Sequence, residues 1–290
     1  MKKLLTIFIL ILSVKGFSQS YFSGKFNYCT PKKEESKKKF DAVIKALQFP
    51  NLYEKASYTM VKVASQDSTY CDAYFMAGYL FRLQDKYEEA IAYYYVADSL
   101  AKNKSLEFKQ NLATEMMRAE RADLAREKYQ EMVKYFPNSP EGYYGVANTA
   151  IVLNDFDNGL NNLKKAEKLY ESSGEVKDDV KYMYGMLNCL KENYEEALPY
   201  FDEVYSTYKK DIGYLSLYAL TLIKVGKSRN DGKIIKKAWK TYEKIKDVQV
   251  PEDLAKKIKQ EFSSNEILTF KENTSQSQAS VQICENLWLK

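Results

Sequence analysis

Apolar and small residues recur at spacings of three and four along most of the chain, which is the period of one face of a helix. One such stripe starts at Tyr87 and another, with the same spacings, starts at Tyr194. A small residue stands second in each stripe and recurs at steps of 34, 35, 34 and 38 residues: Ala56, Ala90, Ala125, Gly159 and Ala197. A sixth stripe, around Ala238, follows after a delay of seven residues. The chain is therefore predicted to repeat one helical unit about every 34 residues.

Each of these helices is preceded by another apolar stripe at a constant distance. A small residue lies midway along that first stripe, at Gly78, Ala113, Ala147, Gly185 and Ala219. Small side chains let two helices cross closely, and large residues such as Tyr94 and Phe201 fill the space beside the contact. The repeated unit is therefore predicted to be a pair of packed helices.

A helix pair every 34 residues, with this pattern of small and aromatic positions, resembles the tetratricopeptide repeat (TPR). The stretch "AYFMAGYLFRLQDKYEEAIAYYYVA", Ala73 to Ala97, carries the resemblance most fully, and the similarity extends over residues 37–250. The resemblance implies an all-α fold, a right-handed superhelical solenoid of about six helix pairs with a concave and a convex face.

Several segments depart from the repeat. Pro199 should delay or kink the second helix of the fifth pair, and Gly226–Lys233 is predicted to form an unusually long turn in the sixth pair. Residues 251–262 are predicted to form a polar capping helix with proline in its first turn. Residues 263–290 are predicted to be a flexible tail.

The N-terminus has the pattern of a secretory signal peptide. Lys2 and Lys3 precede an apolar run, Leu4–Val14, and the small residues Gly16 and Ser18 predict cleavage after residue 18. Residues 19–36 are then a polar leader, and the protein is expected to be exported, periplasmic or secreted. A retained membrane anchor is the alternative, although 11 apolar residues are too few to span a bilayer. Of the 44 Lys and Arg residues, three leave with the signal, so 41 basic and 39 acidic side chains remain, and no nucleic-acid partner is expected.

The resemblance implies that the first helix of each pair lines a concave groove. The positions predicted to face a partner there are aromatic, methionine or polar: Phe75, Tyr79, Arg82, Met117, Tyr144, Asn148, Tyr182 and Met186. One acidic residue marks an end of each pair: Asp72, Glu107, Glu141 and Asp179. Such a surface suits an extended peptide or an inserted helix. The alternative is that these side chains pack on one another or on the folded-back tail.

The sequence offers no catalytic constellation, because it contains no histidine and no glycine-rich phosphate loop, and its cysteines lack zinc spacing. No enzyme activity, cofactor or metal is expected. The prediction is an exported scaffold that binds another polypeptide through its groove. A glycan- or cell-wall-binding role, and a subunit of an envelope assembly that contacts partners through its convex face, are the alternatives.

Four cysteines in an exported chain raise the question of disulfides. A bond between Cys71 and Cys189 is excluded, because three repeats separate them. Cys29 precedes the first helix and can reach Cys71 at the start of the next pair, which would pin the leader to the end of the solenoid. A Cys189–Cys284 bond requires the tail to fold back.

Overall fold

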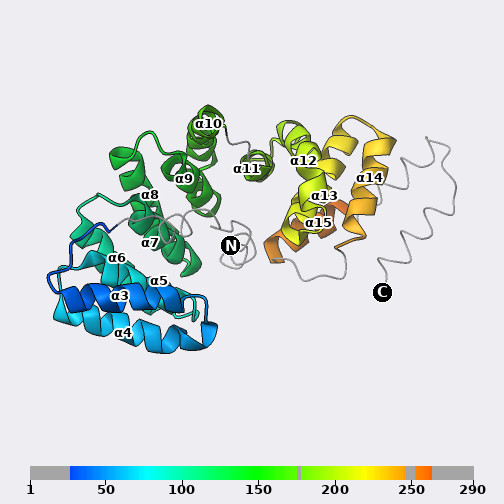
Figure 1. Cartoon of the computed structure of the whole chain (residues 1–290). Helices are drawn as coiled ribbons and strands as arrows, with labels where there is room; N and C mark the ends of the chain where they lie inside the picture. Colours follow the sequence, from blue (N-terminus) through cyan, green and yellow to red (C-terminus); the bar gives the residue numbers. More distant parts are fainter. Residues whose placement is uncertain (1–26, 175–177, 246–251, 263–290) are drawn as a thin grey trace. The chain divides into compact units, whose positions relative to one another are not determined.

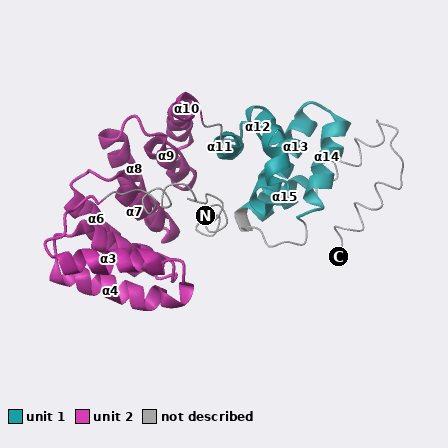
Figure 2. Ribbon diagram, in the orientation of Figure 1, with its two compact units in different colours: residues 1–8, 177–290 teal, residues 9–176 magenta. Residues whose placement is uncertain are grey.

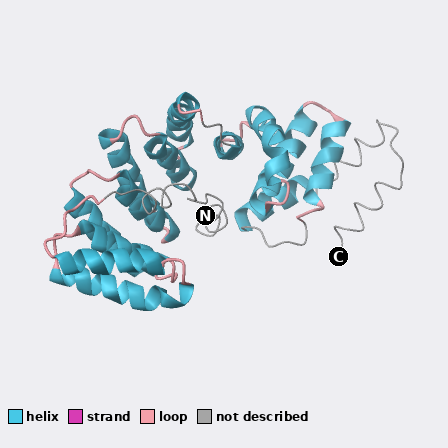
Figure 3. Ribbon diagram, in the orientation of Figure 1, coloured by secondary structure: helices cyan, strands magenta, loops and turns pink. Residues whose placement is uncertain are grey.

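The computed structural model describes residues 27–174, 178–245 and 252–262 of the chain (Figure 1). The predicted signal peptide and the predicted tail lie outside these residues. The described residues form thirteen α-helices and one short 3-10 helix, without a β-strand (Figure 3). They belong to two compact units, residues 9–176 and residues 177–290 with 1–8 (Figure 2), so each unit is described by itself.

The N-terminal unit consists of four helix pairs that pack in chain order. The pairs are α3 (Glu34–Ala46) with α4 (Tyr53–Gln66), α5 (Cys71–Arg82) with α6 (Tyr87–Ala101), α7 (Leu106–Arg118) with α8 (Ala122–Tyr135), and α9 (Pro140–Leu153) with α10 (Phe156–Ser172). The short 3-10 helix η1 (Pro50–Leu52) lies between α3 and α4.

The C-terminal unit continues the pattern with two pairs and a last helix. The pairs are α11 (Asp178–Leu190) with α12 (Tyr194–Tyr208), and α13 (Ile212–Ser228) with α14 (Gly232–Tyr242). The helix predicted at the C-terminal end of the repeats is α15 (Glu252–Phe262), which packs on α13. The predicted all-α architecture of consecutively packed helix pairs is confirmed within each unit.

Small residues lie where the helices of a pair cross, as their spacing predicts. A Cβ atom at Gly78 would lie 2.8 Å from Cδ1 of Tyr94, and one at Gly185 would lie 2.9 Å from the Phe201 ring. Both aromatic side chains are completely buried. The glycine and the ring, sixteen residues apart in both pairs, therefore set how closely the two helices approach.

The corner inside each of the last five pairs has one conformation. A residue with positive φ ends the first helix, and the next backbone N–H bonds to the carbonyl five residues earlier, as in Lys86 N to Phe81 O at 3.0 Å. This double feature is the Schellman end of a helix, which usually has glycine at the left-handed position. Here that position is filled by Asp85, Glu120, Asn154, Glu192 and Asn230.

The long turn predicted over Gly226–Lys233 is wrong. Helix α13 continues to Ser228 and α14 starts at Gly232, so the extra residues lengthen the helix and the corner stays short. The Asp231 side chain accepts bonds from the N–H groups of Lys233 (2.8 Å) and Ile234 (3.2 Å), which fixes the start of α14. Pro199 does not delay its helix either, because α12 already begins at Tyr194.

Candidate functional site

The leader segment, residues 27–33, is attached to the second helix pair. Cys29 forms a disulfide bond with Cys71, the first residue of α5, with the two Cα atoms 5.5 Å apart. This is the pairing that the sequence placed within reach. Cys189 is free and buried, and Cys284 lies outside the described residues.

Asp72 holds the main chain of the leader segment. Its side chain is fully buried in the first turn of α5, and its two oxygens accept the backbone N–H groups of Tyr28 (3.2 Å) and Cys29 (2.8 Å). A carboxylate is favoured at this end of a helix by the helix dipole. Farther along the leader segment, the N–H of Lys32 bonds to buried Asp67 at 2.7 Å. The main chain of this stretch is therefore hydrogen-bonded to the repeats, while the side chains of Lys32 and Lys33 stay exposed.

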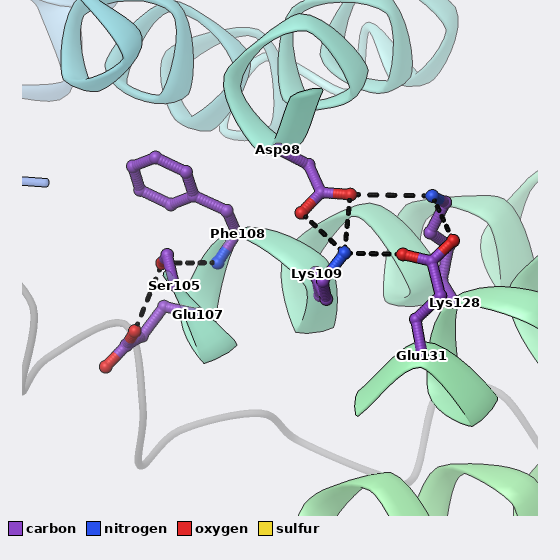
Figure 4. Close-up of polar contacts among 7 residues, drawn as sticks. All are labelled: Asp98, Ser105, Glu107, Phe108, Lys109, Lys128 and Glu131. Atoms are coloured by element: carbon purple, nitrogen blue, oxygen red, sulfur yellow. Dashed lines mark hydrogen bonds and ion pairs between the residues drawn. The ribbon is translucent and has the colours of Figure 1, made fainter. Parts of the chain in front are cut away.

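The side chain of Tyr28 reaches the third helix pair. Its hydroxyl donates to Oε2 of Glu107 at 2.5 Å, and its ring meets the ring of Phe108 edge to face, with centroids 5.1 Å apart. Burial and the bond to Glu107 both hold the pKa of Tyr28 above its usual value, so the phenol stays a neutral donor. Ser105 fixes the Glu107 end of this contact (Figure 4), because its hydroxyl donates to Glu107 (3.2 Å) and accepts from Phe108 N (3.1 Å).

The Phe108 ring that contacts Tyr28 is itself part of a cluster of aromatic rings. Phe108 stacks on Phe75 with centroids 4.3 Å apart, and Phe75 lies 5.2 Å from the ring of Tyr94. We use the name leader site for Asp72, Glu107 and Phe108, which contact Tyr28 and Cys29 through hydrogen bonds and a ring contact beside the disulfide. The leader site spans the N-terminal turns of α5 and α7 and combines two carboxylates with an apolar wall.

A largely buried ion cluster lies next to this site and joins three helices (Figure 4). Lys109 has an exposed fraction of 1% and its Nζ lies 3.0 Å from Asp98 Oδ1 and 2.5 Å from Glu131 Oε2. Lys128 bonds to Glu131 at 2.8 Å. Partial burial opposes ionisation of Glu131, but the two lysines hold its pKa below the usual range. The cluster links α6, α7 and α8, and so fixes the second and third pairs to each other.

Half of the predicted groove residues are not on an open surface. Phe75, Met117, Tyr182 and Met186 are buried. Tyr182 packs against the rings of Phe201, Tyr208 and Tyr214, and Phe75 packs as described above. Neighbouring first helices lie close enough for large side chains at these positions to pack between them, which removes them from solvent. In this half, the alternative that the side chains pack on one another holds.

The other half of the predicted groove residues is partly exposed, on α5 and α9: Tyr79, Arg82, Tyr144 and Asn148. Arg82 lies 4.8 Å from the centre of the Tyr79 ring and donates to Oδ1 of Asn111 at 3.3 Å. Tyr144 meets Tyr170 edge to face at 6.3 Å. These four side chains are thus positioned by neighbours while part of each stays accessible.

Neither a metal centre nor a membrane span is evident in the part of the chain that the structure describes. The one group of candidate metal ligands there is Cys29, Cys71 and Asp72, and the disulfide occupies both sulfur atoms. None of the described helices has the length and apolar character required to cross a bilayer.

No protein-family model matches the sequence, and neither does any curated protein. Solved structures do match. A tetratricopeptide repeat protein from Parabacteroides merdae aligns with a TM-score of 0.60 and 14% identity over 89% of this chain and all of that one. YrrB, described as a TPR protein with an unusual peptide-binding site, aligns with a TM-score of 0.52 and 16% identity over 69% of this chain and 97% of that one.

A chain in the structure of the APC/C hetero-tetramer Cut9–Hcn1 aligns with a TM-score of 0.57 and 15% identity. The match covers 78% of this chain and 42% of that chain, so this protein spans less than half of it. The fold is TPR-like. At identities this low the likeness concerns the fold alone.

The second to fifth TPR-like pairs share a carboxylate at the second residue of the first helix, but its partner differs between pairs. Glu141 accepts from the hydroxyl of Tyr170 (2.8 Å), and Asp179 accepts from the hydroxyl of Tyr208. In both cases the tyrosine lies 29 residues later, near the end of the second helix of the same pair. The corresponding residues for Asp72 and Glu107 are Ala101 and Phe136, which carry no hydroxyl, and the leader segment supplies donors to these two acids.

Proposed function

We propose that the chain is an exported, non-enzymatic scaffold that binds another polypeptide through the first helices of its TPR-like pairs. One observation carries the proposal. The N-terminal unit already holds a non-helical stretch of polypeptide, its own leader segment, on the first turns of α5 and α7 through main-chain N–H groups and one tyrosine. A surface that recognises main-chain groups and an aromatic side chain suits peptides.

Two features support export. The apolar run Leu4–Val14 behind two lysines is typical of a secretory signal. The bond between Cys29 and Cys71 is of the kind that persists in oxidising compartments such as the periplasm or the extracellular space. A periplasmic or secreted location is therefore part of the proposal.

The partner-facing surface that we propose consists of the partly exposed residues Tyr79, Arg82, Tyr144 and Asn148 on α5 and α9. Tyrosine and arginine are the residue types that contribute most in protein interfaces, and asparagine can bond to a peptide main chain. YrrB, described as a TPR protein with an unusual peptide-binding site, has a similar fold, which supports peptide binding as the function.

Crosslinking in intact cells, followed by identification of the attached proteins, tests the proposal. The double variant Tyr79→Ala/Tyr144→Ala should lose its crosslinked partner while far-UV circular dichroism and melting stay close to wild type. The control is Tyr58→Ala/Tyr95→Ala, since these two exposed tyrosines lie on the second helices α4 and α6. If the control variant loses the partner and the Tyr79/Tyr144 variant retains it, the binding surface is on the second helices and the proposal fails.

A further inference from the structure

The leader site has the properties of a binding site for a polypeptide that is not part of the repeats. A buried carboxylate needs donors, because burying an ionised group without them is costly. Asp72 is fully buried and receives the N–H groups of two consecutive leader residues. Its two oxygens accept N–H groups from consecutive residues, which point the same way only where the backbone bends, as it does at Tyr28 and Cys29. The contact therefore recognises a bent main chain whatever its side chains are.

Glu107 and Phe108 make the site selective for a tyrosine side chain. Glu107 accepts the hydroxyl of Tyr28, and Phe108 provides an aromatic wall for the ring. A phenylalanine would keep the wall contact and lose the hydrogen bond, whereas a small residue would lose both. The leader site therefore favours a tyrosine one residue before the position that Cys29 occupies.

A comparison of the pairs shows that this arrangement is particular to the second and third. In the fourth and fifth pairs, the carboxylate in the first turn accepts a hydrogen bond from a tyrosine of the same pair, Tyr170 or Tyr208. The second and third pairs have Ala101 and Phe136 in those places, so the donors come from a segment outside the repeat. A segment from outside the repeat can in principle be exchanged for another, which an internal tyrosine cannot.

The disulfide decides whether that exchange can occur. While Cys29 is bonded to Cys71, the leader segment stays at the site at a very high effective concentration. Cys29 is partly exposed and Cys71 is fully buried, so Cys29 is the more accessible end of the bond for an incoming thiolate. Without the bond the leader segment is still joined to α3 by the main chain, but Tyr28 and Cys29 are held at the site by noncovalent contacts alone.

We propose that the leader site is a peptide-binding site for a bent segment that contains tyrosine, that the leader occupies it in the disulfide form, and that a dithiol reductant opens it to a segment of another polypeptide. One thiolate of the reductant attacks the Cys29 sulfur, and Cys71 leaves and takes up a proton. The second thiol then displaces and protonates Cys29, closing a disulfide in the reductant. Two electrons pass from the dithiol to the protein. The inference rests on the proposed function in assigning peptide binding to the first helices.

The test uses a fluorescent peptide with the sequence of residues 27–33 and the change Cys29→Ser. Fluorescence anisotropy should show binding to the full mature protein in dithiothreitol, and at least roughly tenfold weaker binding to the oxidised protein, because the tethered leader competes. The unreduced protein variant Tyr28→Ala/Cys29→Ser, whose own leader is weakened, should bind the peptide as well. Changing Tyr28→Phe in the peptide should weaken binding roughly tenfold or more, since the hydrogen bond to a charged acceptor is lost.

Matched carboxylate variants locate the site. In the reduced protein, Glu107→Gln should weaken peptide binding. Glu141→Gln, at the same position of the fourth pair but bonded to Tyr170, should leave binding unchanged. Hydrogen exchange of the Tyr28 and Cys29 amides should accelerate on reduction, while circular dichroism shows that the repeats stay folded.

Three results would overturn the inference: no peptide binding by the folded reduced protein or by the Tyr28→Ala/Cys29→Ser variant, equal effects of Glu107→Gln and Glu141→Gln, or concentration-dependent dimerisation in place of peptide binding. The last result would assign the site to the leader of a second copy. The proposed function has a separate readout, because its test concerns Tyr79 and Tyr144 with the cellular partner. If that partner is lost in the Tyr79/Tyr144 variant while the reduced protein binds no leader peptide, the function stands and this inference falls.

Discussion

Replacing Gly145 by alanine tests the contact between α8 and α9, which positions the half-exposed side chains of Tyr144 and Asn148. Gly145 is buried in α9, and a Cβ atom added there would overlap the ring of Tyr129 on α8. The ring is itself almost completely buried, so it has little room to move away. The substitution therefore forces either the ring out of its place or the two helices apart.

Two opposing contributions set the change in unfolding free energy that Gly145→Ala causes. Alanine in a helix interior is favoured over glycine by about 1 kcal/mol. Over-packing a buried contact typically costs about 1–3 kcal/mol, and the overlap with three ring atoms places this site at the upper end. The net loss of unfolding free energy should be about 2 kcal/mol, which lowers the melting temperature by roughly 4–8 °C for a domain of this size.

Denaturation followed by circular dichroism measures this loss, and a second background makes the test decisive. In a Tyr129→Ala protein the ring is gone, so Gly145→Ala should raise stability by about 1 kcal/mol through helix propensity alone. An equal loss in both backgrounds, or no loss in the wild-type background, would show that the ring of Tyr129 does not pack against Gly145.

Three further outcomes are expected. Gly78→Leu should lower the unfolding free energy by about 1–3 kcal/mol or more, because its Cβ meets Cδ1 of Tyr94 at 2.8 Å; a neutral effect in thermal denaturation would contradict the crossing of α5 and α6. Reducing the disulfide should lower the stability of the N-terminal unit by up to about 4 kcal/mol, since it closes a loop with a sequence separation of 42, and a melt unchanged by dithiothreitol would contradict this. Glu115→Gln should raise stability at neutral pH, because burial outweighs Arg118 and Arg82 and raises the pKa of Glu115. Its ionised form is therefore destabilising in the folded state, and the gain should disappear below about pH 4, where Glu115 is neutral in both states.

The regular spacing of apolar residues was sufficient to predict the helix pairs and their crossings. Where a small residue is followed sixteen positions later by a large aromatic one, as in Gly78 and Tyr94, the two helices that carry them cross at that point. The corners carried no comparable signal. Their left-handed residues include Asp85, Glu120 and Glu192, and none of these is the glycine that normally identifies such a position. For the same reason the polar stretch Gly226–Lys233 suggests a loop, although its first three residues belong to α13 and its last two to α14.

The site was only partly predictable. The period places Phe75, Tyr79, Tyr144 and Tyr182 on first helices in equivalent registers, but it does not tell which rings the next helix covers. Phe75 and Tyr182 are covered because neighbouring aromatic side chains are large enough to reach them, and Tyr79 and Tyr144 stay partly open. The geometry allowed the disulfide, since Cys29 precedes the first helix and Cys71 starts the next pair, but it left open whether the bond forms. The bond from Tyr28 to Glu107 had no signal in the sequence, because 79 residues separate them and neither belongs to a motif.

These contacts move the start of the folded region from residue 37 to Tyr28. Without the leader segment, buried Asp72 loses two N–H donors, Glu107 loses its bond from the Tyr28 hydroxyl and Phe108 loses an edge-to-face ring. Each buried group that loses a donor costs about 1–3 kcal/mol, and more when it is charged. The first pair has no carboxylate bonded in this way, and the fourth and fifth pairs carry their own tyrosines. The second and third pairs therefore depend on residues that precede the first helix, and cleavage of a signal peptide after Ser18 would leave those residues in place.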